Sequence, residues 1–346
     1  MTLLLRWDYC QATNRRILHG AFQFAVGSAM KILARVVLIL ALLVIAAGAP
    51  SAQIKKVRLS MPTFAITEVP FKIAQAKGFY REEGLDVEMI LIRGALGVTA
   101  LLGGSVDYTT ASGSIIAAAV RGIGVKLALI IDAKPAFELV SEPQVRAYEA
   151  LKGRPIGISS RGGSVDLLTR LMLERNGLNP DKDVLLLVIG TQQEMMIALK
   201  TGRIAAALMT PPRNLLLYRE GFHKLGSSGT YLATAPTGGI GVTDEKLRQD
   251  PAQVLGFVRG TLKGIRYYRQ NRAESVNFLS KELGINEPSL AAQIFDWHAG
   301  QLAENGMADQ AWMRGAIEFT KKSLGVTKDI STEQVFNFSF VERALR

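Results

Sequence analysis

After residue 56 the chain alternates between short apolar runs and segments whose apolar residues recur at helical spacing. The run 125–132 (VKLALIID) is almost entirely apolar, as expected of a parallel strand buried on both faces. Glycines such as Gly78 and Gly122 follow the helical segments, where they are typical helix terminators. The pattern predicts strands at 57–61, 86–92, 106–110 and 125–132, and helices at 70–77, 96–102 and 114–120.

The same alternation resumes after residue 154 and then changes to a helical tail. It predicts strands at 155–159, 184–189, 204–209 and 222–225, helices at 164–176, 192–201 and 213–220, and tail helices at 251–271, 273–283, 288–305 and 309–324. Strands that alternate with helices indicate α/β units with parallel sheets and right-handed crossovers. Two such units, separated by linkers near 136–143 and 231–241, indicate two doubly wound lobes with a hinge between them.

Residues 30–52 have the layout of a secretory signal peptide. Lys31 and Arg35 precede the apolar run 36–47 (VVLILALLVIAA), which is shorter than the ~20 apolar residues of a membrane span. Small residues follow, and we expect cleavage after Ser51 or Ala52. An uncleaved N-terminal anchor is the alternative, and residues 1–29 are either an over-extended start or a long leader. The protein is therefore expected in the periplasm.

Composition and charge exclude several functional classes. The chain is 48% hydrophobic and 21% charged, as is typical of a folded globular protein. Its net charge of +11 is spread along the sequence without a basic run, so nucleic-acid binding is not expected. The only cysteine, Cys10, precedes the folded region, and His223 and His298 are the only histidines after residue 52. We therefore expect no metal site, no cofactor and no enzymatic activity.

Four loops that directly follow predicted strands are rich in hydroxyl groups, glycine and backbone amides, and they span 62–68, 109–114, 159–164 and 209–212. In a doubly wound sheet, the loops beyond the carboxyl ends of the strands face the ligand crevice. N–H groups at a helix start carry partial positive charge and can hold an oxyanion without a dedicated cation. The candidate ligand-binding residues are Thr63, Phe64, Thr67, Ser112, Gly113, Ser114, Ser160, Arg161, Gly162, Gly163, Ser164, Thr210 and Pro211.

Each of these positions also has a structural interpretation. A serine or threonine before a helix is commonly only an N-cap. Arg161 either pairs with a ligand anion or points to solvent, and Phe64 either stacks on the ligand or packs in the core. Glu68 either binds a cationic ligand or is a solvated or capping carboxylate. The binding interpretation is favoured because four such loops recur at equivalent places in two units.

Four segments, taken in order, carry a resemblance to one known family: 69–90, 100–114 (ALLGGSVDYTTASGS), 150–184 and 198–212 (ALKTGRIAAALMTPP). The run GFYREEGLDV (78–87) is the most specific match. These segments resemble the periplasmic binding proteins for aliphatic sulfonates, taurine and nitrate, a group that also includes proteins that bind or make the thiamine pyrimidine precursor. The resemblance covers 57–242 well and the helical tail loosely. Ala205 stands where the family usually has aspartate, which leaves the ligand open.

The resemblance implies a type II periplasmic-binding-protein fold with two crossings between the lobes. Lobe one, at 53–140 and 236–346, is then interrupted by lobe two, at 141–235. The implied function is that of the substrate-binding component of an ABC importer. It would capture a small anionic organic solute, of the sulfonate, taurine, nitrate or carboxylate type, in the interlobe cleft. The expected partners are this solute and the ABC permease of the inner membrane, and the protein is expected to be a monomer.

Two alternatives remain open at this stage. One is a pyrimidine-precursor-related binding protein or enzyme of the same fold, and the other is a partner that presents its ligand to a sensor. The resemblance to the enzyme group is limited to the fold, because that group has a cysteine-rich motif and residues 53–346 contain no cysteine.

Overall fold

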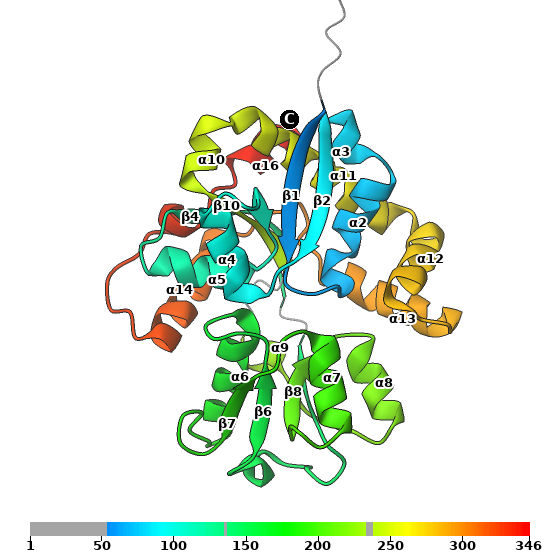
Figure 1. Ribbon diagram of the computed structural model, residues 1–346, viewed down its shortest axis with the longest axis vertical. Coiled ribbons are helices and arrows are strands. Elements are labelled where there is room, and N and C mark those ends of the chain that lie inside the picture. Colours follow the sequence, from blue (N-terminus) through cyan, green and yellow to red (C-terminus); the bar gives the residue numbers. More distant parts are fainter. Residues whose placement is uncertain (1–53, 135–136, 233–237) are drawn as a thin grey trace, which may run out of the picture. The chain divides into compact units, whose positions relative to one another are not determined.

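The computed structural model describes residues 54–134, 137–232 and 238–346, which contain two five-stranded sheets (Figure 1). Residues 1–29 and the predicted signal peptide at 30–52 lie outside this described part. The strand orders are β2-β1-β3-β10-β4 in the first sheet and β7-β6-β8-β5-β9 in the second. Both sheets belong to one unit, 54–346, of the two into which the chain divides. The predicted α/β fold with two lobes is confirmed.

The first sheet combines four strands from residues 55–132 with β10, which follows the whole second sheet in the sequence. β1 pairs in parallel with β2 and β3, whereas β10 runs antiparallel to β3 and β4. A Cβ atom at Gly241 in β10 would lie 2.3 Å from Cγ1 of Ile115, so this glycine permits the close packing of the strand. The strands are β1 (Lys55–Met61), β2 (Leu85–Leu91), β3 (Tyr108–Thr109), β4 (Val125–Asp132) and β10 (Gly238–Thr243).

The second sheet is built in the same manner. β6 pairs in parallel with β7 and β8, and β5 runs antiparallel to β8 and β9. In each sheet, the antiparallel strand is the one that follows the connection from the other sheet. Both sheets are therefore mixed, whereas the sequence predicted parallel sheets. The strands are β5 (Glu138–Ser141), β6 (Pro155–Ile158), β7 (Leu185–Val188), β8 (Ala206–Met209) and β9 (His223–Ser227).

Strands β5 and β10 occupy segments that the hydrophobic pattern assigned to linkers. The predicted linkers near 136–143 and 231–241 each contain the beginning of a strand. Residues 138–140 consequently pair in the second sheet, although they were expected in lobe one. The lobe boundaries at 140/141 and 235/236 otherwise stay predictions.

Two hydrophobic cores pack helices against the two faces of the first sheet (Figure 1). α2, α3, α11, α12, α13 and α16 contribute to one core, where Tyr108 and Phe257 stack with ring centroids 4.0 Å apart. α4, α5, α14 and α15 contribute to the other. The helices are η1 (Ile66–Glu68), α2 (Val69–Ala76), α3 (Phe79–Glu82), α4 (Gly94–Leu102), α5 (Ser112–Val120), α10 (Asp244–Gln249), α11 (Pro251–Gln270), α12 (Arg272–Leu283), α13 (Pro288–Ala299), α14 (Gln310–Leu324), α15 (Thr332–Val335) and α16 (Ser339–Leu345).

The helices of the second sheet follow the predicted bounds closely. α6 packs Leu168 and Met172 into one core of this lobe, and α7 packs Met195 and Leu199 into another. The predicted helical tail is also confirmed, except that α13 ends at Ala299 and does not continue to 305. The elements are η2 (Tyr148–Leu151), α6 (Ser164–Arg175), α7 (Gln192–Lys200), α8 (Arg213–Arg219) and α9 (Ser228–Tyr231).

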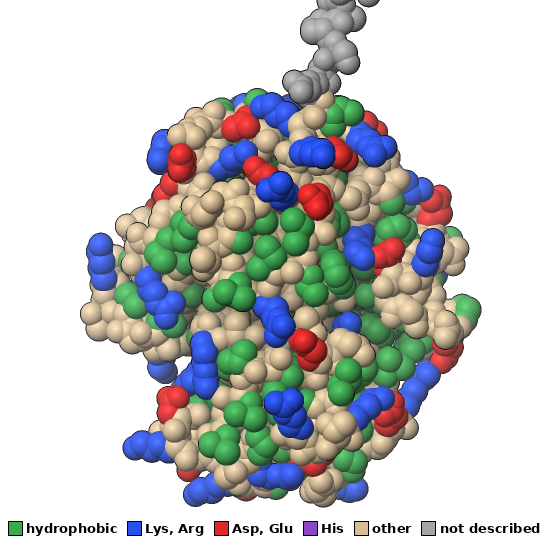
Figure 2. All heavy atoms as spheres, in the orientation of Figure 1, with side chains coloured by type: hydrophobic (Ala, Val, Ile, Leu, Met, Phe, Trp, Pro, Cys, Tyr) green, Lys and Arg blue, Asp and Glu red, His purple; other side chains and the backbone are tan. Residues whose placement is uncertain are grey.

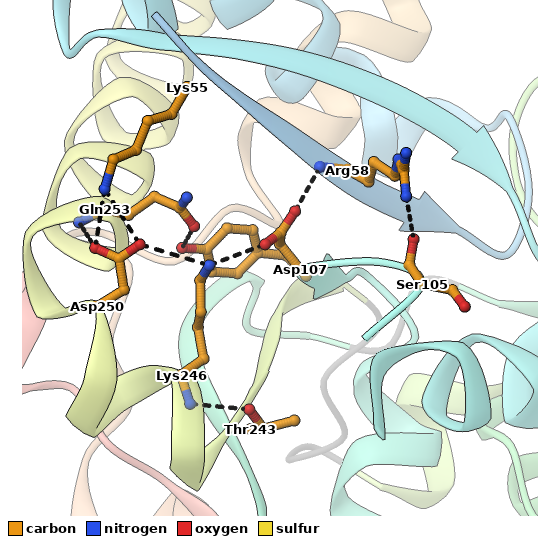
Figure 3. Close-up of polar contacts among 9 residues, drawn as sticks. Lys55, Arg58, Ser105, Asp107, Thr243, Lys246, Asp250 and Gln253 are labelled. Atoms are coloured by element: carbon orange, nitrogen blue, oxygen red, sulfur yellow. Dashed lines mark hydrogen bonds and ion pairs between the residues drawn. The ribbon is translucent and has the colours of Figure 1, made fainter. Parts of the chain in front are cut away.

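A polar network joins the start of the helical tail to the first strands (Figure 3). Lys246 lies 2.9 Å from a carboxylate oxygen of Asp107 and 3.7 Å from one of Asp250. Asp107 also accepts a hydrogen bond of 2.9 Å from the backbone N–H of Arg58. The network therefore joins β1, the loop before β3 and the α10–α11 junction, which lie far apart in the sequence.

His298 has a structural role in the core. Its Nε2 lies 2.9 Å from Oδ1 of Asp132, its Nδ1 lies 3.0 Å from the hydroxyl group of Tyr268, and the Asp132 and His298 side chains are fully buried. Asp132 ends β4 and His298 lies in α13. The contact therefore attaches the end of β4 to the helical tail. From this end of β4 the chain continues toward lobe two. Removing one partner of a buried pair is strongly destabilising.

Candidate functional site

A pocket lies at the carboxyl ends of parallel strands of both lobes. It encloses about 650 Å³ of space free of atoms, including open solvent at its mouth. The loops after β1, β3, β6 and β8 all contribute to its wall. The lining residues are Pro62, Thr63, Thr67, Glu68, Gly94, Thr110, Ala111, Ser112, Gly113, Ser114, Phe137, Ser159, Ser160, Gly163, Ser164, Val165, Gly190, Thr191, Gln192, Met195 and Thr210.

The two lobes touch each other around this pocket. A Cβ atom at Gly113, in the first turn of α5, would lie 2.1 Å from Oγ of Ser164, the first residue of α6. A Cβ atom at Gly94, at the start of α4, would lie 2.2 Å from Oγ of Ser160. The guanidinium group of Arg213 in α8 donates a hydrogen bond of 3.2 Å to the carbonyl oxygen of Phe64. Helix starts from both lobes are therefore in contact where they border the pocket.

The helix starts supply hydrogen-bond donors to the pocket. In α5, the N–H group of Ser112 donates a hydrogen bond of 2.7 Å to the carbonyl oxygen of Thr110. The N–H groups of the next two residues of α5 and those in the first turn of α6 have no partners within their own helices, and these ends carry partial positive charge. The hydroxyl oxygen of Ser160 is buried and has no hydrogen-bond partner among the described residues. Such groups suit the oxygen atoms of a small solute, charged or neutral.

Nine of the thirteen predicted residues line the pocket. They are Thr63, Thr67, Ser112, Gly113, Ser114, Ser160, Gly163, Ser164 and Thr210. The other four lie elsewhere: the ring of Phe64 is 40% exposed, and Pro211 is buried behind Thr210. The guanidinium group of Arg161 donates a hydrogen bond of 2.7 Å to the carbonyl oxygen of Leu186.

The fourth residue outside the pocket wall, Gly162, has a local role. Its N–H group donates a hydrogen bond of 2.7 Å to the carboxylate of Asp166 in the first turn of α6. Gly162 has a φ of 72°, a left-handed conformation that glycine adopts without strain. The glycine therefore shapes the loop that places Gly163 and Ser164 at the pocket.

Sequence reasoning did not select several pocket residues. Gln192, the first residue of α7, accepts hydrogen bonds from the backbone N–H (2.8 Å) and the hydroxyl group (3.1 Å) of Thr210. Thr191 and Glu194 form a capping box whose sequence signature marks this helix start. This capping signature could have identified the start of α7 as part of the pocket, because helix starts were the feature used to predict the other pocket loops. Phe137 and Met195 had no comparable signal.

Glu68 is the most unusual group in the pocket wall. Only 2% of the residue is exposed, and burial raises the pKa of its carboxyl group from 4.5 to about 7. Hydrogen bonds from Thr67, Ala65 and Thr110 lower the pKa, whereas the nearby Asp132 raises it. The bond to the N–H group of Ala65 also caps η1, so the capping interpretation is correct and Glu68 borders the pocket as well.

The pocket differs from the outer surface in its charge. Figure 2 shows lysine and arginine side chains spread over the viewed face, with aspartate and glutamate side chains among them. Among the described residues that form the pocket wall there is no lysine, arginine or histidine, and Glu68 is the only acidic one. Within the described residues, no set of three His, Cys, Asp or Glu is arranged to hold a metal, and no helix has the length and apolarity needed to span a membrane.

The family model described as NMT1/THI5 like matches residues 66–275, and the chain belongs to this family. The matched segment contains all residues that line the pocket except Pro62 and Thr63.

Individual comparisons agree with this assignment. The chain is 27% identical over 322 residues to the riboflavin-binding protein RibY of Chloroflexus aurantiacus, covering 86% of this chain and 89% of that protein. It is similar in structure to the alkanesulfonate-binding protein SsuA of Xanthomonas axonopodis pv. citri bound to MOPS, with a TM-score of 0.66, 17% identity and coverage of 84% and 97%. The periplasmic nitrate-binding protein NrtA of Synechocystis PCC 6803 gives a TM-score of 0.66, 16% identity and coverage of 84% and 88%. The fold is that of the periplasmic binding proteins.

Proposed function

We propose that this protein is the solute-binding component of an ABC importer and that it holds one small polar solute between its lobes. The observation that carries the proposal is the pocket, whose wall comes from strand-end loops of both lobes. Ligand crevices of α/β sheets lie at this position. The family membership and the named functions of the relatives support the same conclusion.

Capture would proceed by closure of the lobes over the solute. An open form would admit the solute, and contacts between the helix starts of α5 and α6 would then form around it. The closed form would present a joint surface of both lobes to a membrane permease, whereas the open form would not. The predicted signal peptide supports a periplasmic location for this cycle.

The donors in the pocket would hold the oxygen atoms of the solute. The N–H groups that follow Ser112 in the first turn of α5, those in the first turn of α6, and the hydroxyl groups of Ser160 and Ser164 fit a sulfonate, carboxylate, nitrate or carbonyl oxygen. Pro62, Phe137 and Met195 add apolar wall, which favours a solute with a carbon body over a bare inorganic ion. The anionic class expected from the sequence remains a candidate on the strength of the helix starts.

A thermal-shift screen with product analysis tests the proposal. The purified protein would be heated with sulfonates, carboxylates, nitrate, pyrimidines and flavins, and the mixtures would be analysed for chemical change. A true solute at 100 times its Kd stabilises the folded state by about 2.7 kcal/mol without being consumed. If no solute raised the melting temperature, or if a solute were converted into a product, the proposed function would be rejected.

A further inference from the structure

Glu68 lines the pocket, and one of its two carboxylate oxygens has spare acceptor capacity. Its Oε2 accepts hydrogen bonds from the hydroxyl group of Thr67 (2.6 Å) and the N–H group of Ala65 (3.2 Å). Its Oε1 has only a long contact of 3.4 Å with the hydroxyl group of Thr110. A carboxylate oxygen can accept two hydrogen bonds, so Oε1 can take a further donor.

We propose that Glu68 determines the specificity of the pocket and that the solute carries an N–H donor which bonds to Oε1 of Glu68. The opposite, oxygen-bearing end of the solute would lie at the first turns of α5 and α6. This inference rests on the proposed function and defines the solute as bipolar, with an acceptor end and an N–H end. The N–H group belongs either to a neutral ring amide or imide or to a protonated amine.

The absence of cationic side chains from the pocket wall supports an N–H donor. A solute with only negative charge would share a buried pocket with Glu68, and among the described residues no lysine, arginine or histidine lines that pocket. Placing two negative charges together in a buried site is unfavourable. An N–H donor instead supplies the partner that a buried carboxylate requires.

The charged groups around Glu68 come from three other elements. Asp132, at the end of β4, raises the pKa of Glu68, and one of its own carboxylate oxygens is bonded to His298. The guanidinium group of Arg213 in α8 lies near Glu68, and burial lowers its pKa while Glu68 raises it. Nε and Nη1 of Arg213 have no hydrogen-bond partners among the described residues. Arg213 bonds to Phe64 and is not among the residues that line the pocket.

The pKa of Glu68 gives the inference a measurable consequence. With a pKa of about 7, Glu68 is partly protonated at neutral pH before the solute arrives. An N–H donor at Oε1 favours the ionised carboxylate, so binding releases a proton and strengthens as the pH rises from 6 to 8. A solute with only negative charge would favour the protonated group and would show the opposite trend.

The variant Glu68→Gln would separate these cases. Because Ala65 and Thr67 both direct donors to the Oε2 position, the amide oxygen of glutamine is expected there. The amide NH₂ group would then replace Oε1 and face the solute. A donor would meet a donor, so an N–H solute should bind at least tenfold more weakly, whereas an anion should bind as well or better. Glu88→Gln, at an exposed position in β2, is the matched control.

Thermal shift followed by calorimetry would be run at pH 6 and 8 with three groups of probes. Riboflavin and uracil carry ring N–H donors, and taurine and β-alanine carry ammonium donors. Each is paired with a donor-blocked counterpart: N3-methylriboflavin, 1,3-dimethyluracil, trimethyltaurine and trimethyl-β-alanine. Ethanesulfonate, propionate and nitrate are anions without an N–H group. The two donor-bearing groups, each with its blocked counterparts, distinguish a ring N–H group from an ammonium group as the donor.

The expected result is binding of a donor-bearing probe that is lost on N-methylation, weakened in Glu68→Gln and unchanged in Glu88→Gln. Equal binding of blocked and unblocked probes, or binding of plain anions alone, would overturn the inference and leave the proposed function intact. If no probe of any group stabilised the wild-type protein, both would be rejected. Should Glu68→Gln fail to fold, the methylated pairs and the pH trend of the wild type decide the question by themselves.

Discussion

The contact between Gly113 and Ser164 allows the closure of the lobes to be tested with a single methyl group. A Cβ atom at position 113 would lie 2.1 Å from Oγ, 2.8 Å from the backbone nitrogen and 3.0 Å from Cα of Ser164. The hydroxyl group of Ser164 can rotate away, but its backbone cannot. Gly113 lies in α5 without a positive φ, so alanine fits the helix itself and only the approach of lobe two is obstructed.

The expected cost of Gly113→Ala follows from this geometry. Overpacking of a well-packed contact typically costs about 1–3 kcal/mol. If the lobes part in the open form, the cost applies only to the closed, solute-bound form. Binding should therefore weaken by roughly 5- to 150-fold. The unliganded protein should be unchanged or slightly more stable, because alanine favours a helix over glycine by about 0.5–1 kcal/mol.

Calorimetric titration of the identified solute would measure the effect of Gly113→Ala on Kd, and thermal melting without solute would measure its effect on stability. Gly103→Ala is the matched control, because its Cβ atom would approach only carbonyl oxygens of α4, at 3.4 Å and 3.9 Å. An unchanged Kd in Gly113→Ala would refute the closure described here. A large loss of stability without solute would show that the two helix starts also touch in the unliganded protein.

Three further changes have defined outcomes. Burial raises the pKa of Glu68 from 4.5 to about 7, so its stabilising contribution is full below pH 4.5 and is lost as the pH rises through 7. The free energy of unfolding of Glu68→Gln, relative to that of the wild type, should therefore rise by up to ~3 kcal/mol between pH 4 and pH 8. Urea titrations that give equal pH slopes for the two proteins would contradict this. His298→Ala leaves Asp132 buried without its partner and should cost about 3–5 kcal/mol, measured by the same titration. Arg219→Ala breaks an exposed interlobe ion pair with Glu287 and should change the Kd of the solute by less than about threefold. A larger loss of affinity in calorimetry would mean that this pair holds the lobes together.

The fold was predictable from the sequence wherever apolar periodicity and helix ends agreed. The helices of lobe two and the tail follow this pattern. β5 and β10 were missed because neither alternates between apolar and polar residues and both adjoin proline or glycine-rich segments. β10 (GGIGVT) has low intrinsic strand propensity, and its conformation depends on close packing against β4 and Ile115. Such packing is a tertiary interaction, and the local pattern of apolar and polar residues does not contain it.

The pocket was predictable to the extent that it consists of helix starts. Serine, glycine and threonine residues after a strand indicate where N–H groups are exposed. Most of the candidate binding residues chosen on this basis line the pocket. Glu68 is different, since its function depends on burial and on the donors that Ala65 and Thr67 direct at one of its oxygens. Arg161 is the opposite case. It was chosen as a candidate binding residue, but its guanidinium group bonds to the carbonyl oxygen of Leu186. Side-chain direction decides both cases, and sequence does not specify it.

The position of β10 also constrains the order in which the chain can fold. Because β10 lies between β3 and β4, the first sheet is split into separate pieces until residues 238–243 have been synthesised. The second sheet draws all its strands from the continuous segment 138–227 and meets no such delay. Lobe two is thus able to assemble early, while lobe one waits for pairings between residues far apart in the chain, which form slowly.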